Sequence, residues 1–124
     1  YKDQRVYLVK ENTKLIAGFS VNLNLNQRTQ LEDIGFELES SERVESSCEA
    51  LILFTLRNTN ISPFEVMLTS REYIVDDMKK IGIKKIWGTC SHNLLNFYTK
   101  FGFELVEEKI NYENEKKYLL IFNV

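Results

Sequence analysis

The sequence has few of the residues that build small disulfide-rich or metal-binding proteins. Its 124 residues include two cysteines, one histidine and one proline. Cys48 and Cys90 are too few for a disulfide framework and lack metal-ligand spacing, so we predict no metal site. Two free thiols are typical of a reducing compartment, and we therefore expect a cytoplasmic protein.

Long apolar runs and a strong excess of one charge are also absent. No apolar stretch approaches the roughly 20 residues that a membrane helix needs, and no signal peptide is visible, so we predict no membrane contact. The formal net charge is −2, with Lys and Arg scattered along the chain. Because nucleic-acid binders concentrate positive charge on one face, this composition disfavours a nucleic-acid partner.

What remains is the composition of an ordinary globular domain, with 44% hydrophobic and 27% charged residues. The length predicts one domain over residues 1–124. Apolar patterns and turn residues predict strands over residues 5–10, 14–25, 48–56, 84–90, 103–110 and 117–124. Helices are expected before Gly82 and before Gly102, because glycine commonly ends a helix.

The order of these elements predicts an α/β (α+β) fold. A strand, a helix and a further strand follow one another in the middle of the chain, and such a unit places its strands parallel with a right-handed crossover. Hairpins flank this unit on both sides. Two capping boxes compete for the start of the long helix, one at Ser62-Pro63-Phe64-Glu65 and one at Thr69-Ser70-Arg71-Glu72.

Between Gly82 and Glu104, several spacings agree with those of one family. Ser91 is followed seven residues later by Tyr98 and then by Lys100-Phe101-Gly102-Phe103-Glu104. Over about residues 48 to 105 the chain resembles the GNAT acyltransferases. The resemblance implies a mixed, mostly antiparallel sheet with a central parallel βαβ unit and helices packed on it. The family spacing also favours the helix start at Thr69, with residues 60–68 as a loop.

The resemblance implies transfer of an acyl group from acyl-CoA to a small-molecule or peptide amine by direct attack. In the family the two central parallel strands diverge, and the thioester lies in the V between them. Tyr98 matches the position of the general acid that protonates the departing thiolate, whereas its periodicity alone favours a core aromatic. Glu49, Glu45 or an ordered water would be the base, and solvated surface acids are an equally open interpretation of both glutamates.

The same resemblance implies where the acyl-CoA would lie. It would contact the end of the central strand, the loop that follows, the first turns of the long helix and the start of the short helix, which Ser91 is placed to cap. The implied cofactor-binding residues are Phe54, Thr55, Leu56, Arg57, Ser62, Val66, Met67, Leu68, Ser91 and Asn93.

The sequence departs from the family in the loop that would hold the pyrophosphate. Residues 58–68 contain no glycine and no arginine, although glycines let a backbone approach phosphates closely. A branch of the superfamily that also lacks this glycine loop, the autoinducer and N-acyl amino acid synthases, is weakly similar. The donor is therefore acetyl-CoA or another acyl-CoA, or alternatively an acyl-carrier protein. A third alternative is an inactive GNAT-like binding or regulatory module.

The family's first strand and helices have no counterpart before the opening hairpin. Two alternatives follow: they lie upstream of Tyr1, or a second subunit completes the sheet edge in a homodimer.

Overall fold

The computed structural model describes residues 3–55, 62–110 and 113–124, with the backbone alone for residues 52–55, 63 and 64. Its elements follow one another as β1 (Gln4–Glu11), β2 (Lys14–Asn22), α1 (Gln30–Ile34), η1 (Ser40–Glu42), β3 (Ser47–Thr55), α2 (Pro63–Lys80), β4 (Lys85–Ser91), η2 (His92–Leu94), α3 (Leu95–Phe101), β5 (Glu104–Ile110) and β6 (Lys116–Asn123). Each predicted strand is present, with bounds that differ from the predicted ones by three residues or fewer. None of the described helices is both long and apolar enough to cross a membrane.

The six strands form one mixed sheet in the order β1-β2-β3-β4-β6-β5. Only β3 and β4 pair in parallel, and every other neighbouring pair is antiparallel. This arrangement confirms the predicted mostly antiparallel sheet with a central parallel βαβ unit.

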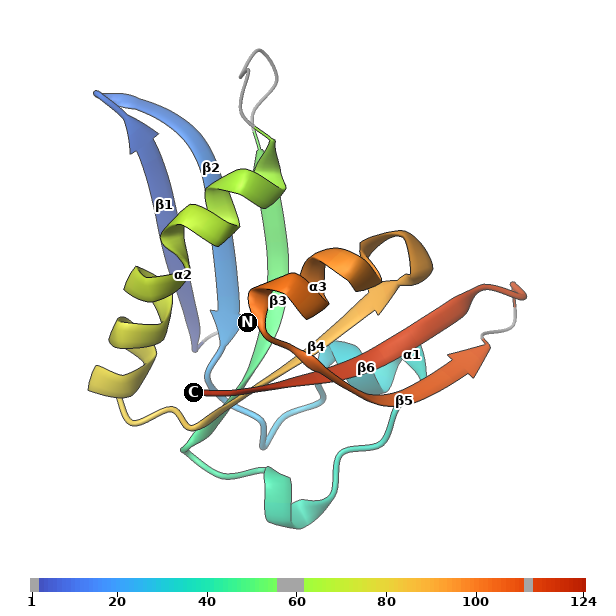
Figure 1. Cartoon of the computed structure of the whole chain (residues 1–124). Coiled ribbons are helices and arrows are strands. Elements are labelled where there is room, and N and C mark those ends of the chain that lie inside the picture. The colour runs from blue at the N-terminus through green and yellow to red at the C-terminus, as the bar shows by residue number, and fades with distance from the viewer. Residues whose placement is uncertain (1–2, 56–61, 111–112) are drawn as a thin grey trace.

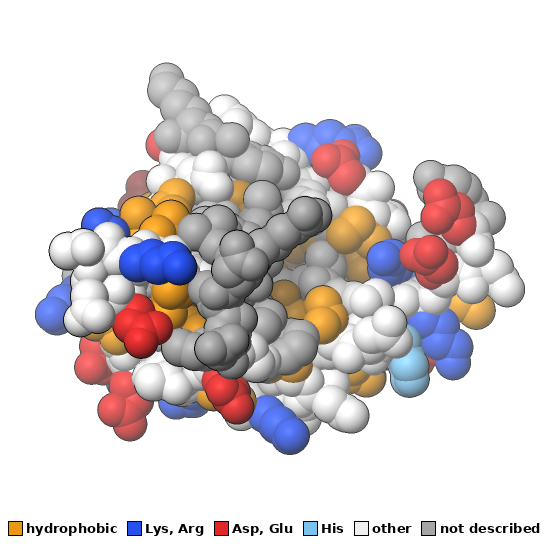
Figure 2. Space-filling view, turned by 90° about the horizontal axis from the view of Figure 1, so that it is seen from above, with side chains coloured by type: hydrophobic (Ala, Val, Ile, Leu, Met, Phe, Trp, Pro, Cys, Tyr) orange, Lys and Arg blue, Asp and Glu red, His pale blue; other side chains and the backbone are white. Residues whose placement is uncertain are grey.

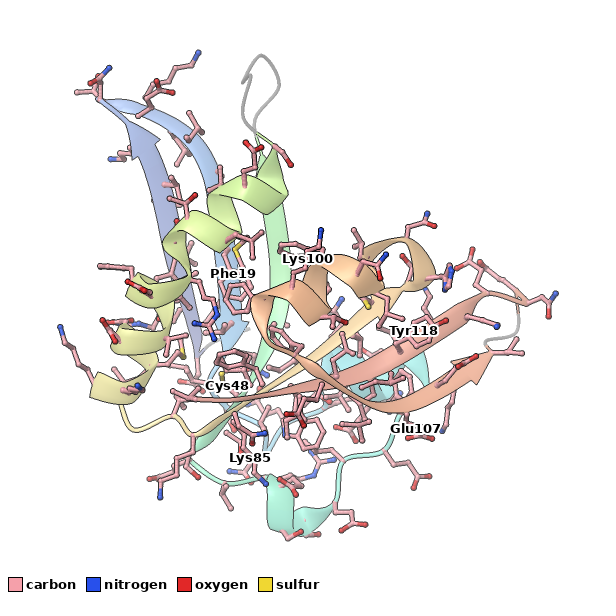
Figure 3. All side chains as sticks on the ribbon, in the orientation of Figure 1. Phe19, Cys48, Lys85, Lys100, Glu107 and Tyr118 are labelled. Carbon is pink, nitrogen blue, oxygen red and sulfur yellow. The ribbon has the colours of Figure 1, made fainter. Side chains whose placement is uncertain are left out.

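Helices pack on both faces of the sheet. Helices α2 and α3 cover one face, where the larger core cluster joins Phe19 of β2, Met67 of α2 and Phe101 of α3. Phe19 projects from β2 on the side of α2, as Figure 3 shows. On the other face, α1 buries Leu31 against Trp87 of β4. The two faces are called the α2/α3 face and the α1 face below.

The sheet splits between its two parallel strands. Paired residues on β3 and β4 run from Ser47 and Lys85 only to Glu49 and Trp87, and beyond that point the strands diverge (Figure 1). The pairing of β3 with β2 skips Leu51, which is therefore a β-bulge. Because a bulge bends its strand and increases the local twist, the extra residue at Leu51 accounts for the divergence directly after the last pair.

Helix α2 begins at Pro63, so the predicted start at Thr69 is wrong. The helix therefore starts at the upstream of the two expected positions, with proline at the first helical position. Val66 and Met67 explain the preference, because both side chains are 6% exposed and extend the buried face of the helix by a turn. The free energy gained by burying Val66 and Met67 outweighs what the capping box at Thr69 would contribute as a helix start.

Candidate functional site

The split between β3 and β4 leaves the inner edges of both strands without a partner strand among the described residues. Strand β3 continues to Thr55 and β4 to Ser91, but no paired residues join them past Glu49 and Trp87. Their other edges are occupied by β2 and β6. Backbone N–H and C=O groups on the inner edges are therefore available to a ligand that pairs as a strand does. Figure 2 views the molecule from above, at the open end of the split, and shows hydrophobic side chains on this surface.

Tyr98 lies on α3 beside β4, on the α2/α3 face of the split sheet. Its ring packs edge-on against Phe97 and Phe103, with centroids 5.3 and 5.2 Å away. Burial, with a smaller contribution from Cys90, raises the pKa of Tyr98 to about 12. None of the hydrogen bonds within the described residues uses its hydroxyl. Tyr98 is thus a neutral phenol at physiological pH, held by packing.

Gly88 of β4 lies directly against Phe103, the ring on which Tyr98 packs, and it is not among the predicted site residues. A Cβ atom at Gly88 would lie 3.2 Å from Phe103 Cε1 and 3.8 Å from Tyr98 Cε1. A glycine inside a strand often marks a close approach of another group, so this signal was present in the sequence.

Cys90 lies two residues further along β4 and faces the same core as Tyr98. Its thiol is free and buried. Burial raises its pKa to about 11, although Lys117 opposes this shift. A thiol of such low acidity is a poor nucleophile at neutral pH. We therefore regard Cys90 as a residue that packs beside Tyr98 and not as a reacting group.

The first turn of α2 offers little to a phosphate group. Pro63 has no N–H, and the N–H of Val66 already bonds the Ser62 carbonyl oxygen at 3.2 Å. Glu65 adds a carboxylate in this turn, where a helix would otherwise favour an anion. The side chains of Val66 and Met67 are buried in the core, whereas Leu68 is 38% exposed.

Ser91 and Asn93 lie where β4 passes into η2. Ser91 occupies the N-cap position, but its side chain makes no capping hydrogen bond, so the expected cap is not formed. Both residues border an open hollow of about 480 Å³ together with His92 and residues Glu115, Lys116 and Lys117. His92 Nδ1 lies 2.9 Å from the hydroxyl oxygen of Tyr118, which is itself buried on β6.

The remaining cofactor-binding predictions fall at the far end of β3. Phe54 and Thr55 pair through their backbones with Gly18 and Ala17 of β2, and their side chains are not described. Leu56 and Arg57 lie outside the described residues.

Glu49 lies on the α1 face, opposite to Tyr98. Its carboxylate accepts hydrogen bonds from the backbone N–H groups of Gln30 at 3.2 Å and Leu31 at 2.8 Å, at the start of α1. The side chain is 2% exposed. Burial raises the pKa of Glu49, while the hydrogen bonds from Leu31, Gln30 and Asn22 oppose that shift. Glu49 therefore anchors α1 to the strand where the sheet splits.

Glu45 is exposed in the turn before β3 and borders a separate hollow of about 420 Å³ that also includes Asp3 and Asn24. The structure therefore brings Tyr98, Gly88 and Cys90 together, but neither Glu45 nor Glu49 joins them. Within the described ranges, no three side chains of His, Cys, Asp or Glu gather as metal ligands.

Solved structures of acyl-transferring enzymes share this architecture. A probable acetyltransferase from Staphylococcus epidermidis matches with a TM-score of 0.69 at 15% identity, covering 99% of this chain and 69% of that one. The CoA-dependent acyl-homoserine lactone synthase MesI matches with a TM-score of 0.71 at 13% identity, covering 99% and 63%. A putative acetyltransferase of the GNAT family from Desulfovibrio desulfuricans matches with a TM-score of 0.69 at 11% identity, covering 98% and 69%.

Sequence comparison adds nothing to this structural likeness. No protein-family model matches the chain, and no curated protein matches it. The identities to the solved structures are low, and the chain spans only about two thirds of the length of each. The fold is nevertheless shared along almost the whole chain: this protein has the GNAT fold of acetyltransferases and acyl-homoserine lactone synthases.

Proposed function

We propose that this chain is an N-acyltransferase that binds an acyl thioester where β3 and β4 diverge and transfers the acyl group to an amine. The observation that carries the proposal is the free pair of strand edges with Tyr98 beside it. The amides of a pantetheine arm would pair with the free edge of β3 as an added strand does. The amine attacks the thioester carbonyl carbon, the C–S bond breaks, and the acyl group leaves on nitrogen.

Tyr98 is the proposed general acid for the departing thiolate. A phenol whose pKa is raised to about 12 is a weak acid for a solvated thiol with a pKa near 8.5. However, the neighbouring Cys90 thiol has its pKa raised to about 11 by burial. A thiolate released in the same surroundings would become more basic in the same way. The donor and the acceptor therefore remain close in acidity, which suits general acid catalysis.

A water molecule is the proposed base that accepts the proton from the amine. The carboxylate of Glu49 already accepts two backbone hydrogen bonds from α1. It also lies on the face of the sheet away from Tyr98. Both observations favour water over Glu49 in this role.

The donor is proposed to be an acyl-CoA, and acetyl-CoA is the simplest one. A second candidate is an acyl group delivered on a carrier protein or as a long-chain thioester, and the start of α2 favours delivery on a carrier protein. Pro63 lacks an N–H and Glu65 carries a negative charge there, so pyrophosphate gains little from this helix. A pantetheine arm without the nucleotide avoids that problem.

The test is the rate of thiol release from acyl thioesters in the presence of a panel of amines. Tyr98→Phe should lower the rate constant for transfer by about 100-fold, because general acid catalysis typically contributes that much or more. Thioester affinity, measured by calorimetry, should change little. Tyr73→Phe is the matched control, since Tyr73 is 70% exposed on α2. Equal transfer rates in wild type and Tyr98→Phe would remove Tyr98 from the mechanism.

The same assay separates the two donors. Acetyl-CoA, a long-chain acyl-CoA and an acyl-carrier protein are compared at matched concentration. Preference for the carrier protein or the long chain would support the second candidate. Tight binding of acetyl-CoA with no effect of the carrier protein would exclude it, and no release from any donor would contradict the transferase proposal.

A further inference from the structure

Helix α3 is too short to hold Tyr98 in place by itself. It runs only from Leu95 to Phe101, and isolated helices of this length are unstable in water, because few hydrogen bonds offset the cost of forming the first turn. At its N-terminal end, neither Leu94, the N-cap residue of α3, nor Ser91, the N-cap residue of η2, forms a side-chain cap. The position of the Tyr98 ring therefore depends on the contacts that α3 makes with other elements.

Arg71 of α2 holds the C-terminal end of α3. Its Nε–H donates a hydrogen bond of 2.6 Å to the carbonyl oxygen of Phe101, the last residue of α3. The last four carbonyl groups of a helix have no partner within the helix itself, and a positive charge is favourable beside them. Figure 1 shows that this end of α3 points towards α2. Because α2 contacts β3 whereas α3 lies against β4, the hydrogen bond joins the helices that belong to the two sides of the split.

The guanidinium group of Arg71 also lies against two aromatic rings. Its Cζ atom is 5.7 Å from the ring centroid of Phe101 and 5.2 Å from that of Phe122 on β6, which are distances typical of cation–π contacts. None of the salt bridges between described residues includes Arg71. A planar guanidinium can donate a hydrogen bond and stack on a ring at the same time, whereas a lysine ammonium cannot.

Both rings beside Arg71 pack on Phe103, which supports Tyr98. The ring centroid of Phe103 lies 5.7 Å from that of Phe101 and 5.5 Å from that of Phe122. On its other side, Phe103 packs edge-on against Tyr98 at 5.2 Å. Phe101, Phe103 and Phe122 are all buried, and close-packed side chains do not shift independently of one another. Loss of the Arg71 contacts should therefore displace the Tyr98 ring.

We propose that Arg71 is a positioning residue that sets where the Tyr98 hydroxyl lies relative to the split between β3 and β4. The inference rests on the proposed function, in which Tyr98 protonates the thiolate that leaves the thioester. Arg71 acts through the end of α3, which it holds against α2, and through the rings that support Tyr98. Without these contacts α3 can shift relative to α2, and the hydroxyl no longer has a fixed position from which to donate its proton.

Two substitutions and a matched control test this role in the transfer assay. Arg71→Met removes the donor and the charge, and it should lower kcat by about 10-fold or more with little change in the KM for the thioester. Arg71→Lys keeps the charge and a donor but not the planar group, and it should recover part of the loss. Lys79→Met removes a positive charge from the exposed last turn of the same helix and should match wild type.

A double-mutant cycle with Tyr98→Phe separates positioning from a general loss of stability. If Arg71 acts through the Tyr98 hydroxyl, Arg71→Met should cause almost no further loss of kcat once that hydroxyl is absent. A destabilised fold would instead lower kcat by the same factor in both backgrounds. Urea denaturation of each variant shows whether the rates are measured on folded protein.

NMR spectra of protein that carries isotope-labelled tyrosine test the same geometry without turnover. The signal that disappears in Tyr98→Phe belongs to Tyr98. It should shift or broaden in Arg71→Met and stay unchanged in Lys79→Met. This measurement also distinguishes the two proposals: a Tyr98 signal that responds to Arg71→Met, in a protein that transfers no acyl group from any donor, would support the positioning role and contradict the proposed function.

Two results would overturn the inference. One is an unchanged kcat together with an unchanged Tyr98 signal in a folded Arg71→Met variant. The other is an equal loss of kcat on Arg71→Met in the presence and in the absence of the Tyr98 hydroxyl, because that result would assign Arg71 to the stability of the fold alone.

Discussion

The turn after α3 should tolerate no side chain, and Gly102→Ala tests this. Gly102 has a φ of +124°, which L residues rarely adopt and which costs them roughly 1–3 kcal/mol. A Cβ atom there would also lie 2.7 Å from Cε2 of Phe122. The ring of Phe122 is 3% exposed and packs against Phe101 and Phe103 at 5.5 Å. It therefore cannot move aside easily, and overpacking adds roughly 1–3 kcal/mol.

Gly35→Ala supplies the matched control. Gly35 ends α1 with a φ of +117°, but nothing lies within 4 Å of the position of its Cβ. The conformational cost is thus nearly the same in both variants, and the difference between them reports the contacts of the new methyl group, chiefly with Phe122 and to a lesser extent with Arg71 Nη2 at 3.3 Å. We expect Gly102→Ala to be less stable than Gly35→Ala by about 1–3 kcal/mol.

Urea denaturation gives the free energy of unfolding of each variant. In a chain of this size each kcal/mol also lowers the melting temperature by about 3–6 °C. Phe122→Leu in the Gly102→Ala background should recover part of the loss, since it removes the ring that the new methyl group meets. Equal destabilisation by the two alanine variants, or no coupling with Phe122→Leu, would refute the reasoning.

Three further predictions concern the loss of stability in acid, the buried carboxylate of Glu49 and the packing of Tyr98. Arg43, together with Thr29, lowers the pKa of Glu32 from 4.5 to about 2. The ionised Glu32 therefore stabilises the fold above the unfolded pKa, and this contribution is lost as pH falls from 4.5 towards 2. In urea titrations at decreasing pH, the free energy of unfolding of Glu32→Gln should fall less steeply than that of wild type. Burial raises the pKa of Glu49, so the folded state binds the proton more tightly than the unfolded state does. The free energy of unfolding of wild type relative to Glu49→Gln should therefore fall as pH rises above about 4.5. A difference between the two proteins that does not change with pH would contradict this sign. Gly88→Ala should push against the Phe103 ring, which packs edge-on against Tyr98, and thereby lower kcat for transfer by about 10-fold or more. An unchanged kcat in a stably folded variant would show that this packing does not position the acid.

Much of the fold could be predicted because the residues that end its helices are recognisable from the local sequence. Helices α2 and α3 both end in the same motif: the N–H of Ile83 bonds the Met78 carbonyl, and the N–H of Phe103 bonds the Tyr98 carbonyl. A glycine with positive φ precedes each of these residues. Such a turn needs glycine whatever surrounds it, so both helix ends were predicted correctly.

The features that were missed depend on long-range contacts. Glu49 accepts hydrogen bonds from residues 18 and 19 positions earlier in the chain, within a segment whose pattern gave no clear element. The bulge at Leu51 is one apolar residue inside an apolar run, so nothing in its spacing distinguishes it. The start of α2 was decided by burial of Val66 and Met67, whereas the competing capping boxes were equivalent in sequence.

The extra residue in β3 also determines which kinds of mutation can alter the split between β3 and β4. The divergence of β3 from β4 comes from one extra residue in β3, between the two segments that pair with β2. It does not come from the chemistry of any side chain. Point substitutions around Leu51 can therefore change the side chains beside the split without closing it, whereas removal of Leu51 should restore continuous pairing of β3 with β2 and so reduce the bend in β3. Substitutions in this chain can accordingly change the side chains beside the opening, while the opening itself depends on the number of residues in β3.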